Sequence, residues 1–171
     1  MKDLCRIDNM KKLIFVRHSK AEDPTFDFSD FERSLTTKGK YIANAMALKL
    51  KEKESSIGVV ISSPAFRAIE TALIFSGIYR IPSNSIIMDD NVLYHRFNFQ
   101  ALREILSKIK DEEDTVTIFG HNPSFTELAY TLSSGECYFI PKCGVVTITF
   151  KVNSWKDIKE NNGKFVYQLK P

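Results

Sequence analysis

The sequence has few of the residues that mark several large classes of protein. Its 171 residues include three cysteines, at positions 5, 137 and 143, and none of them lies in a CxxC motif. An odd number of cysteines without such spacing argues against a disulfide framework and against a zinc site. Cys137 and Cys143 could form a disulfide, but buried free thiols are the expected state in a reducing compartment.

Long apolar runs and concentrated charge are also missing. No apolar stretch approaches the roughly 20 residues that span a bilayer, and residues 1–12 lack the apolar core of a signal peptide. The formal net charge is +3, and no basic run with interleaved aromatic residues occurs. We therefore expect a cytoplasmic protein that binds neither nucleic acid nor a membrane.

The composition is that of an ordinary globular domain, with 43% hydrophobic and 26% charged residues. A chain of this length is sufficient for one well-buried core and short for two. We expect a flexible N-terminal extension at residues 1–10 and a single domain at residues 11–171.

Short β-prone runs alternate with helical patterns along most of the chain. Expected strands cover residues 13–16, 58–61, 86–88 and 115–119, and expected helices cover about residues 37–54, 64–76, 99–109 and 123–132. Two further strands, at residues 145–150 and 164–169, have no helix between them, which indicates a hairpin. The pattern predicts an α/β three-layer sandwich, with a mostly parallel central sheet, helices on both faces and a C-terminal β-hairpin.

Arginines and histidines stand where the predicted parallel strands end. Arg17 and His18 follow the first strand, and His121 follows the strand that ends near Gly120. Arg67 lies near the start of the second helix, for which Ser63 is a good N-cap. Because ligands of open α/β sheets bind beyond the carboxyl ends of strands, we expect these four side chains to share one site.

Two arginines and two histidines beside two helix N-termini suit a dianion such as phosphate. An imidazole that faces a bound phosphoryl group can attack phosphorus and form a phosphohistidine. The remaining cations would stabilise charge on the equatorial oxygens. The sequence contains no P-loop or metal-binding set that would supply this stabilisation instead.

Two features between the first strand and the first helix remain open to two interpretations. Residues 19–35 combine acids with phenylalanines, which fits either a functional loop or a solvated loop held by its aromatic residues. Gly39, in the first turn of the following helix, lowers helix stability. Either a close approach of another backbone segment explains this glycine, or the fold tolerates it.

Four stretches together resemble the histidine phosphatase superfamily, which includes the cofactor-dependent phosphoglycerate mutases. They are residues 16–22 (VRHSKAE), 35–39 (LTTKG), 62–72 (SSPAFRAIETA) and 120–123 (GHNP). They occur in family order, and the resemblance extends from about residue 12 to residue 150. The sequence is most similar to the small bacterial SixA-type phosphohistidine phosphatases.

The resemblance implies a phosphoglycerate mutase-like fold and assigns roles to the four residues. His18 would be the nucleophile that becomes phosphorylated, while Arg17, Arg67 and His121 would hold the phosphoryl group. We also expect Ser19 and Asn122 to contact substrate. The resemblance implies no required metal or organic cofactor.

The sequence departs from the family pattern at two positions. Ser19 replaces the usual glycine after the Arg-His pair, and His95 stands where many members have a glutamate that donates a proton. His95, Glu22, Asp23 or another acid of residues 19–35 could be the general acid. A site without a strong acid favours phosphoramidate substrates, because imidazole leaves far more readily than an alkoxide.

The sequence therefore predicts a phosphatase that works through a phosphohistidine intermediate and acts on phosphohistidine in a partner protein. A broad phosphomonoesterase with the same mechanism, acting on small phosphorylated substrates, is the second reading. A non-catalytic module that binds phosphate or phosphopeptide is the third.

Overall fold

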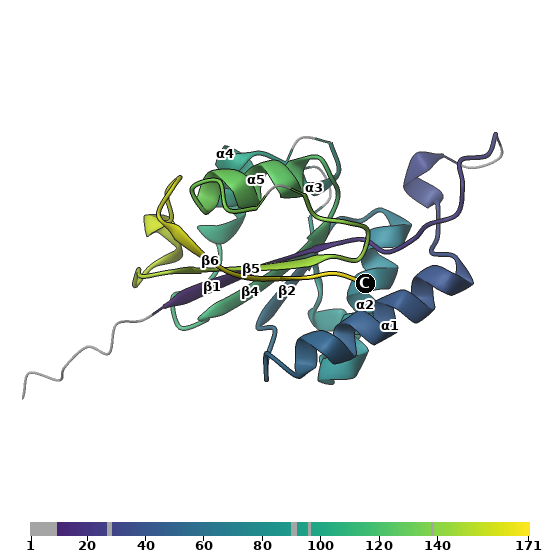
Figure 1. Cartoon of the computed structure of the whole chain (residues 1–171), viewed down its shortest axis with the longest axis horizontal. Helices are drawn as coiled ribbons and strands as arrows, with labels where there is room; N and C mark the ends of the chain where they lie inside the picture. The colour runs from purple at the N-terminus through teal and green to yellow at the C-terminus, as the bar shows by residue number, and fades with distance from the viewer. Residues whose placement is uncertain (1–9, 27–28, 90–91, 96, 138) are drawn as a thin grey trace, which may run out of the picture.

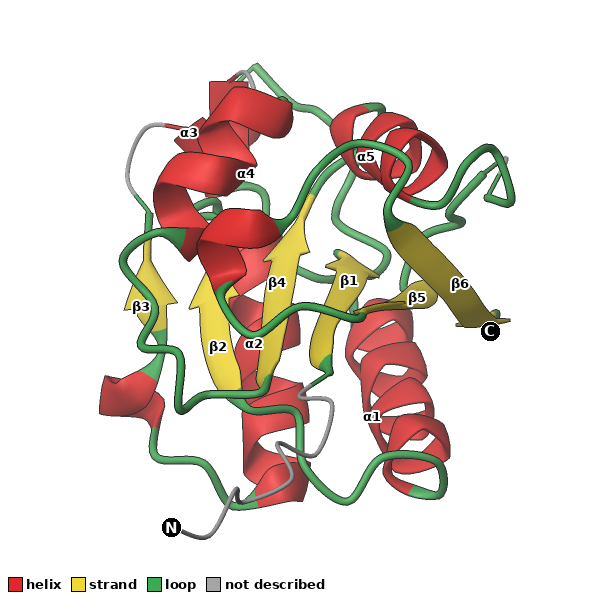
Figure 2. Cartoon of the chain, turned by 90° about the vertical axis from the view of Figure 1, so that its left-hand side faces the viewer, coloured by secondary structure: helices red, strands yellow, loops and turns green. Residues whose placement is uncertain are grey.

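The computed structural model of the chain describes residues 10–26, 29–89, 92–95, 97–137 and 139–171. These residues contain one sheet of six strands in the order β3-β2-β4-β1-β5-β6. The strands are β1 (Lys11–Arg17), β2 (Val59–Ser62), β3 (Ile87–Met88), β4 (Thr115–Gly120), β5 (Val145–Phe150) and β6 (Gly163–Leu169). Strands β1 to β4 are parallel, and β5 and β6 run antiparallel to their neighbours (Figure 2).

Helices cover both faces of this sheet (Figure 1). One layer contains α1 (Thr37–Lys51) and α2 (Phe66–Tyr79), and the other contains α3 (Val92–His95), α4 (Phe99–Leu106) and α5 (Ser124–Leu132). Short 3₁₀ helices η1 (Asp30–Glu32), η2 (Ser83–Ser85) and η3 (Trp155–Asp157) lie in the connections. The predicted three-layer sandwich with a C-terminal hairpin is confirmed.

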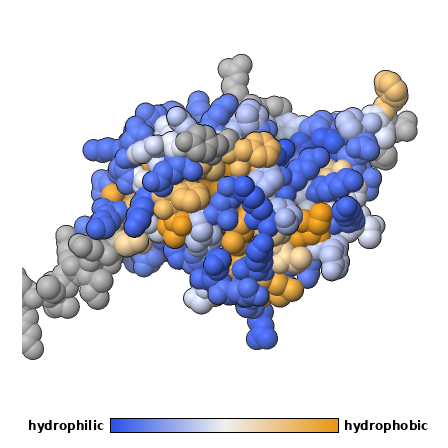
Figure 3. Space-filling view, in the orientation of Figure 1, coloured by the Kyte–Doolittle hydropathy of each residue, from blue (hydrophilic) through white to orange (hydrophobic). Residues whose placement is uncertain are grey.

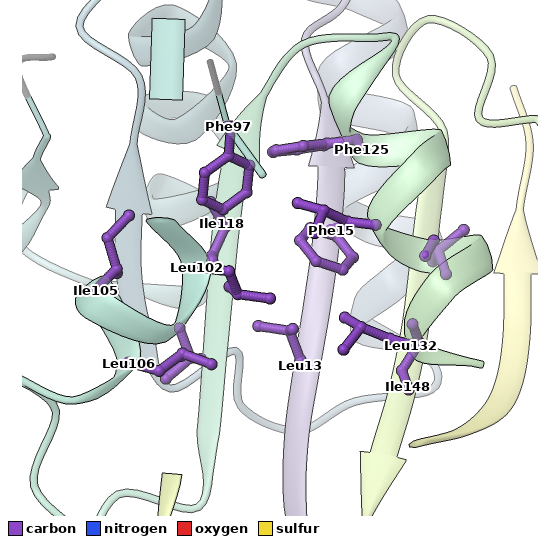
Figure 4. Close-up of a cluster of buried hydrophobic side chains, with 14 of the residues drawn as sticks. Leu13, Phe15, Phe97, Leu102, Ile105, Leu106, Ile118, Phe125, Leu132 and Ile148 are labelled. Atoms are coloured by element: carbon purple, nitrogen blue, oxygen red, sulfur yellow. The ribbon is translucent and has the colours of Figure 1, made fainter. Parts of the chain in front are cut away.

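The central strands are buried because each face of the sheet packs against a helical layer. In β1, Leu13 and Phe15 belong to the core beneath α4 and α5, whereas Ile14 and Val16 belong to the core against α1 and α2. All four side chains have no exposed surface. Figure 4 shows the first of these cores, where Phe15 lies close to Phe125 of α5. A continuous apolar run is typical of a parallel strand covered on both faces.

Side-chain caps begin two of the helices as the sequence indicates. The Thr36 hydroxyl accepts a hydrogen bond from the Gly39 amide at 2.9 Å, and the Asn98 side chain accepts one from the Ala101 amide at 3.0 Å. Helices α1 and α4 are shorter than predicted. Helix α1 ends at Lys51 rather than near residue 54, and α4 ends at Leu106 rather than near residue 109.

The other two long helices start later than predicted. Helix α2 begins at Phe66 rather than at residue 64, and α5 begins at Ser124 rather than at residue 123. Ser63, the expected cap of α2, has its Oγ 2.8 Å from His121 Nε2 and accepts a longer hydrogen bond, of 3.4 Å, from the Ala65 amide. Before α5, Asn122 Nδ2 donates to the Ile140 carbonyl at 3.0 Å.

The C-terminal part closes one edge of the sheet. The irregular connection between β5 and β6 is anchored by Trp155, which is 1% exposed and donates from Nε1 to the Glu113 carbonyl at 2.8 Å. Cys137 and Cys143 are free, buried thiols, as expected. The predicted extension at residues 1–10 falls, apart from Met10, outside the described residues.

The molecular surface seen in Figure 3 is mostly polar, with small groups of apolar residues between polar ones. Among the described residues, no helix has the length and hydrophobicity that crossing a bilayer would require.

Candidate active site

The carboxyl ends of β1, β2 and β4 meet at one edge of the sheet (Figure 2). Arg17 at the end of β1 is in register with Gly120 at the end of β4. The chain leaves β1 toward α1 on one face of the sheet and leaves β4 toward α5 on the other (Figure 1). The carboxyl ends of adjacent strands with such divergent connections are where open α/β sheets bind their ligands.

This edge of the sheet brings together the four residues expected from the sequence. The imidazole rings of His18 and His121 lie 5.1 Å apart between centroids. The charges of Arg17 and Arg67 act on both rings, so all four groups occupy one electrostatic environment. His18 is 8% exposed and Arg67 is 5% exposed, so the site is largely shielded from solvent.

The main chain fixes the tautomer of His18. Its Nδ1 lies 2.7 Å from the carbonyl oxygen of Ser19, and because a carbonyl can only accept, Nδ1 carries the hydrogen. Burial, together with the charges of the nearby arginines and against the opposing effect of the Ser19 hydrogen bond, lowers the pKa of His18 to about 4. At neutral pH the ring is therefore uncharged, with the lone pair on Nε2.

His121 is oriented by a different partner. Its Nε2 lies 2.8 Å from Ser63 Oγ, while its buried Nδ1 has no hydrogen-bond partner among the described residues. Burial lowers the pKa of His121 to about 3, assisted by the charges of His18 and Arg67. A bound anion would act in the opposite direction, because negative charge favours the protonated ring.

Both arginines are held at their ends and keep Nε available. Arg17 Nη1 donates to the Ile140 carbonyl at 2.9 Å, and the Phe139 ring centroid lies 5.7 Å from the guanidinium carbon. Arg67 Nη2 donates to Asp30 Oδ2 at 2.8 Å, and its Nη1 donates to the Asp30 carbonyl.

Unpartnered polar atoms concentrate among these four residues. Of the five buried side-chain polar atoms without a partner in the described part of the chain, three are Arg17 Nε, Arg67 Nε and His121 Nδ1. Buried donors without partners are costly, so the two Nε–H groups suit an anion, and His121 Nδ1 would donate to it as well when it carries hydrogen.

Sequence reasoning missed two residues beside Arg67. Tyr94 donates from its hydroxyl to Asp30 Oδ2 at 2.9 Å, and its ring meets His121 edge-on at 5.6 Å between centroids. Burial alone would raise the pKa of Asp30, but hydrogen bonds from Tyr94 and Arg33 and the charge of Arg67 lower it to about 2. Asp30 is therefore ionised and unsuited to donate a proton at neutral pH.

Ser19 and Gly39 together shape the backbone after the nucleophile. The Ser19 hydroxyl donates to the Gly39 carbonyl at 2.8 Å, and the Ser19 amide donates to Thr71 Oγ1 at 3.1 Å. A Cβ on Gly39 would lie 2.0 Å from the Lys20 carbonyl oxygen, which confirms the close backbone approach as the reason for this glycine. The Ser19 side chain is fully buried, so its contact with substrate stays a prediction.

The remaining predicted residues lie around the site rather than in its centre. The Asn122 side chain donates to the Ile140 carbonyl and accepts from Thr126 Oγ1 at 3.1 Å, so its contact with substrate stays a prediction. Glu22 and Asp23 line a pocket of about 500 Å³ whose lining does not include the two arginines and two histidines. The backbone of His95 lies in α3, and its side chain falls outside what the structure describes.

Within the described ranges, no three His, Cys, Asp or Glu side chains form a group that could hold a metal ion.

No family model and no curated protein matches the sequence. Solved structures do match. A protein assigned as the phosphohistidine phosphatase SixA of Nakamurella multipartitia is 18% identical, with 95% of this chain and 96% of that chain covered and a TM-score of 0.79. The protein histidine phosphatase SixA in complex with tungstate is 24% identical, with 92% and 96% covered and a TM-score of 0.77.

A mycobacterial glucosyl-3-phosphoglycerate phosphatase is 12% identical, with 91% of this chain and 97% of that chain covered and a TM-score of 0.61. At these identities the likeness concerns the fold. The resemblance stated from the sequence is therefore confirmed at that level: the chain has the fold of the SixA-type histidine phosphatases.

Proposed function

We propose that this protein is a phosphatase that works through a phosphohistidine intermediate on His18 and hydrolyses phosphohistidine in a partner protein. The observation that carries this proposal is the tautomer of His18. The ring is neutral, its Nδ1 hydrogen is held by the Ser19 carbonyl, and the lone pair is on Nε2. Arg67 Nε, a donor, and His121 Nδ1, which donates when it carries hydrogen, have no partner among the described residues.

In the first step, His18 Nε2 attacks phosphorus in line with the leaving group. A new N–P bond forms while the bond from phosphorus to the substrate nitrogen breaks. A substrate imidazole that carries a proton on its other ring nitrogen then leaves as a neutral base. The Nε–H groups of Arg17 and Arg67 and the Nδ1 of His121, when it carries hydrogen, donate to the equatorial oxygens.

In the second step, water attacks the phosphorus of the phosphoenzyme. The N–P bond to His18 breaks, inorganic phosphate forms, and His18 returns to the neutral ring. The same three donors hold the oxygens in both steps. A nitrogen leaving group needs little help from an acid, so the chain requires no strong proton donor for this chemistry.

Two of the acids of residues 19–35 bear on the substrate class. Asp30 is ionised at neutral pH, and Glu22 lies in a pocket that the four central residues do not line. An alkoxide leaving group would need a general acid, whereas phosphohistidine would not. Structural likeness to SixA proteins, one of them named a protein histidine phosphatase, supports a protein substrate. The cytoplasmic location expected from the sequence is part of the same proposal.

A small-molecule phosphomonoesterase with the same intermediate is the second candidate. It is favoured by the likeness to a glucosyl-3-phosphoglycerate phosphatase, which acts on a small phosphoester by its name. A module that only binds phosphate has less support, because a neutral His18 with its lone pair on Nε2 can act as a nucleophile but adds no positive charge for binding an anion.

The test compares hydrolysis of a phosphohistidine-bearing protein with hydrolysis of an aryl phosphate, each with chelator present and with His18→Ala as the control. We expect chelator-resistant, His18-dependent loss of phosphohistidine. Activity on the aryl phosphate alone would favour the second candidate. Binding of phosphate without turnover of either substrate would contradict both enzymatic readings.

A further inference from the structure

Asp30 contacts Arg67 and lies outside the four stretches that carry the family resemblance. We propose that Asp30 is a positioning residue. It accepts hydrogen bonds from Nη1 and Nη2 of the Arg67 guanidinium and thereby orients the Nε side of Arg67 toward the phosphoryl group. This inference rests on the proposed function, because it assigns Arg67 to phosphoryl binding.

The geometry of the guanidinium carries the inference. A guanidinium offers two donor edges that matter here: the terminal edge with Nη1 and Nη2, and the side edge with Nε and the second hydrogen of Nη2. Asp30 occupies the terminal edge with two different oxygens, because its carbonyl accepts from Nη1 and its Oδ2 accepts from Nη2 at 2.8 Å. The side edge keeps a buried Nε that has no partner among the described residues.

A side edge with two N–H groups matches two oxygens of a phosphoryl group. If Arg67 were free to rotate, either edge could bind the anion, and the entropy of ordering the side chain would oppose binding. Since Asp30 already fixes the terminal edge, the orientation of the side edge is set before substrate arrives. Pre-orientation of this kind is worth most in a buried site, and Arg67 is 5% exposed.

Asp30 is itself held by groups other than Arg67. Arg33 donates to Asp30 Oδ1 from Nε at 2.9 Å and from Nη2 at 2.6 Å, and the Tyr94 hydroxyl donates to Oδ2 at 2.9 Å. The turn that carries Asp30 is closed by the Glu32 carboxylate, which accepts from the Ser29 amide at 3.0 Å. The carboxylate is thus a fixed support against which Arg67 is placed.

If Asp30 were only a counter-ion of Arg67, its removal would change phosphate affinity in the opposite direction. An ionised Asp30 that acted only as a counter-ion would weaken binding of a dianion, so its removal would strengthen phosphate binding. A support that orients Arg67 predicts weaker binding when the side chain is removed. Asp30→Ala removes the side-chain acceptor of Nη2 and leaves the backbone carbonyl that accepts from Nη1, whereas Asp30→Asn removes the charge and retains a side-chain oxygen that can accept from Arg67.

The experiment measures the affinity for inorganic phosphate by titration calorimetry at pH 7, together with kcat/KM for an aryl phosphate. The variants are Asp30→Ala, Asp30→Asn, Arg67→Ala and the double variant of Asp30→Ala with Arg67→Ala. Asp114→Ala is the matched control, because Asp114 is 62% exposed against 52% for Asp30, and each forms a 2.8 Å ion pair. Asp114 precedes β4, at the opposite end of that strand from His121.

We expect Asp30→Ala to weaken phosphate binding and lower kcat/KM by about tenfold, which is the size of one lost hydrogen bond to a charged group. Asp30→Asn should recover most of both, and Asp114→Ala should match the wild type. In the Arg67→Ala background, Asp30→Ala should lower kcat/KM no further, because two residues that act as a unit are not additive. Thermal unfolding of each variant verifies that it is folded. If Asp30→Ala does not fold, Tyr94→Phe takes its place, because it removes one hydrogen bond to the Asp30 carboxylate. We expect Tyr94→Phe to give a smaller loss of phosphate affinity and of kcat/KM.

Phosphate binding by Asp30→Ala that equals or exceeds the wild type would overturn the positioning role. So would an undiminished effect of Asp30→Ala in the Arg67→Ala background, or an Asp30→Asn variant as impaired as Asp30→Ala. Wild-type protein that binds no phosphate at all would instead overturn the proposed function. The two failures are distinguishable because binding is measured separately from turnover.

Discussion

The nucleophile of the proposed reaction is prepared by one backbone carbonyl. The Ser19 oxygen takes the Nδ1 hydrogen of His18, and burial then keeps the ring neutral. The chemistry therefore depends on the path of the main chain just after β1, which the Ser19 hydroxyl and Gly39 hold in place. An imidazole with this tautomer can attack without first losing a proton to another base.

At the residue scale we predict an unusual titration of His18. Burial lowers its pKa to about 4, so the ring should stay neutral from pH 7 to about pH 5 and become protonated only near pH 4. Nitrogen-15 NMR of the phosphate-free protein measures this, with His18→Ala to assign the signal. Saturating phosphate should raise the midpoint, because a bound anion favours the imidazolium. A midpoint near 6.5 in the free protein would contradict the burial that the structure gives this ring.

The sequence predicted four central residues and missed their supports. Arg17, His18 and His121 could be found because each directly follows a β-prone run. Asp30 could not, because residues 19–35 contain several acids and nothing local distinguishes the one that meets Arg67. The contact joins residues 37 positions apart, so it depends on tertiary structure.

At the element scale, the strands and the long helices could be predicted from the sequence, but the first residues of two helices could not. Buried parallel strands form continuous apolar runs, and α1 and α4 begin at side-chain caps that the sequence displays. Helices α2 and α5 start later than predicted, after Ala65 and Pro123, and neither of these residues forms a side-chain cap. The bonds of Ser63 to His121 and of Asn122 to Ile140 join distant segments, so the local sequence does not display them. Helix α3, with four residues, is too short to produce a period.

Two glycines in helices should respond oppositely to the same substitution. Gly39→Ala would place Cβ 2.0 Å from the Lys20 carbonyl oxygen, so we expect the free energy of unfolding to fall by about 1–3 kcal/mol. Gly77→Ala in α2 meets nothing within 4 Å, so the free energy of unfolding should rise by about 0.5–1 kcal/mol. Urea denaturation of both variants checks this. An unchanged stability for Gly39→Ala would show that α1 does not approach Lys20 so closely.

At the scale of the whole molecule, the site exists because the chain leaves β1 and β4 in opposite directions. Alternating strands and helices predicted a sheet covered on both faces, and the lack of a helical pattern between the last two strands predicted the hairpin of β5 and β6. The sequence did not predict that β5 would pair with β1, since strand order depends on contacts between distant segments. That order leaves β4 between β1 and β2, so the three strand ends that carry the site are adjacent.

The measurement that tests the central claim most directly is to trap the phosphoenzyme. Protein mixed with a phosphohistidine-bearing substrate is quenched in base within the first turnover and mapped by mass spectrometry, with His18→Ala as control. We predict one base-stable, acid-labile phosphate attached to Nε2 of His18, and none in the variant. Turnover that leaves the phosphate on another residue, or that proceeds in His18→Ala at the wild-type rate, would contradict the mechanism.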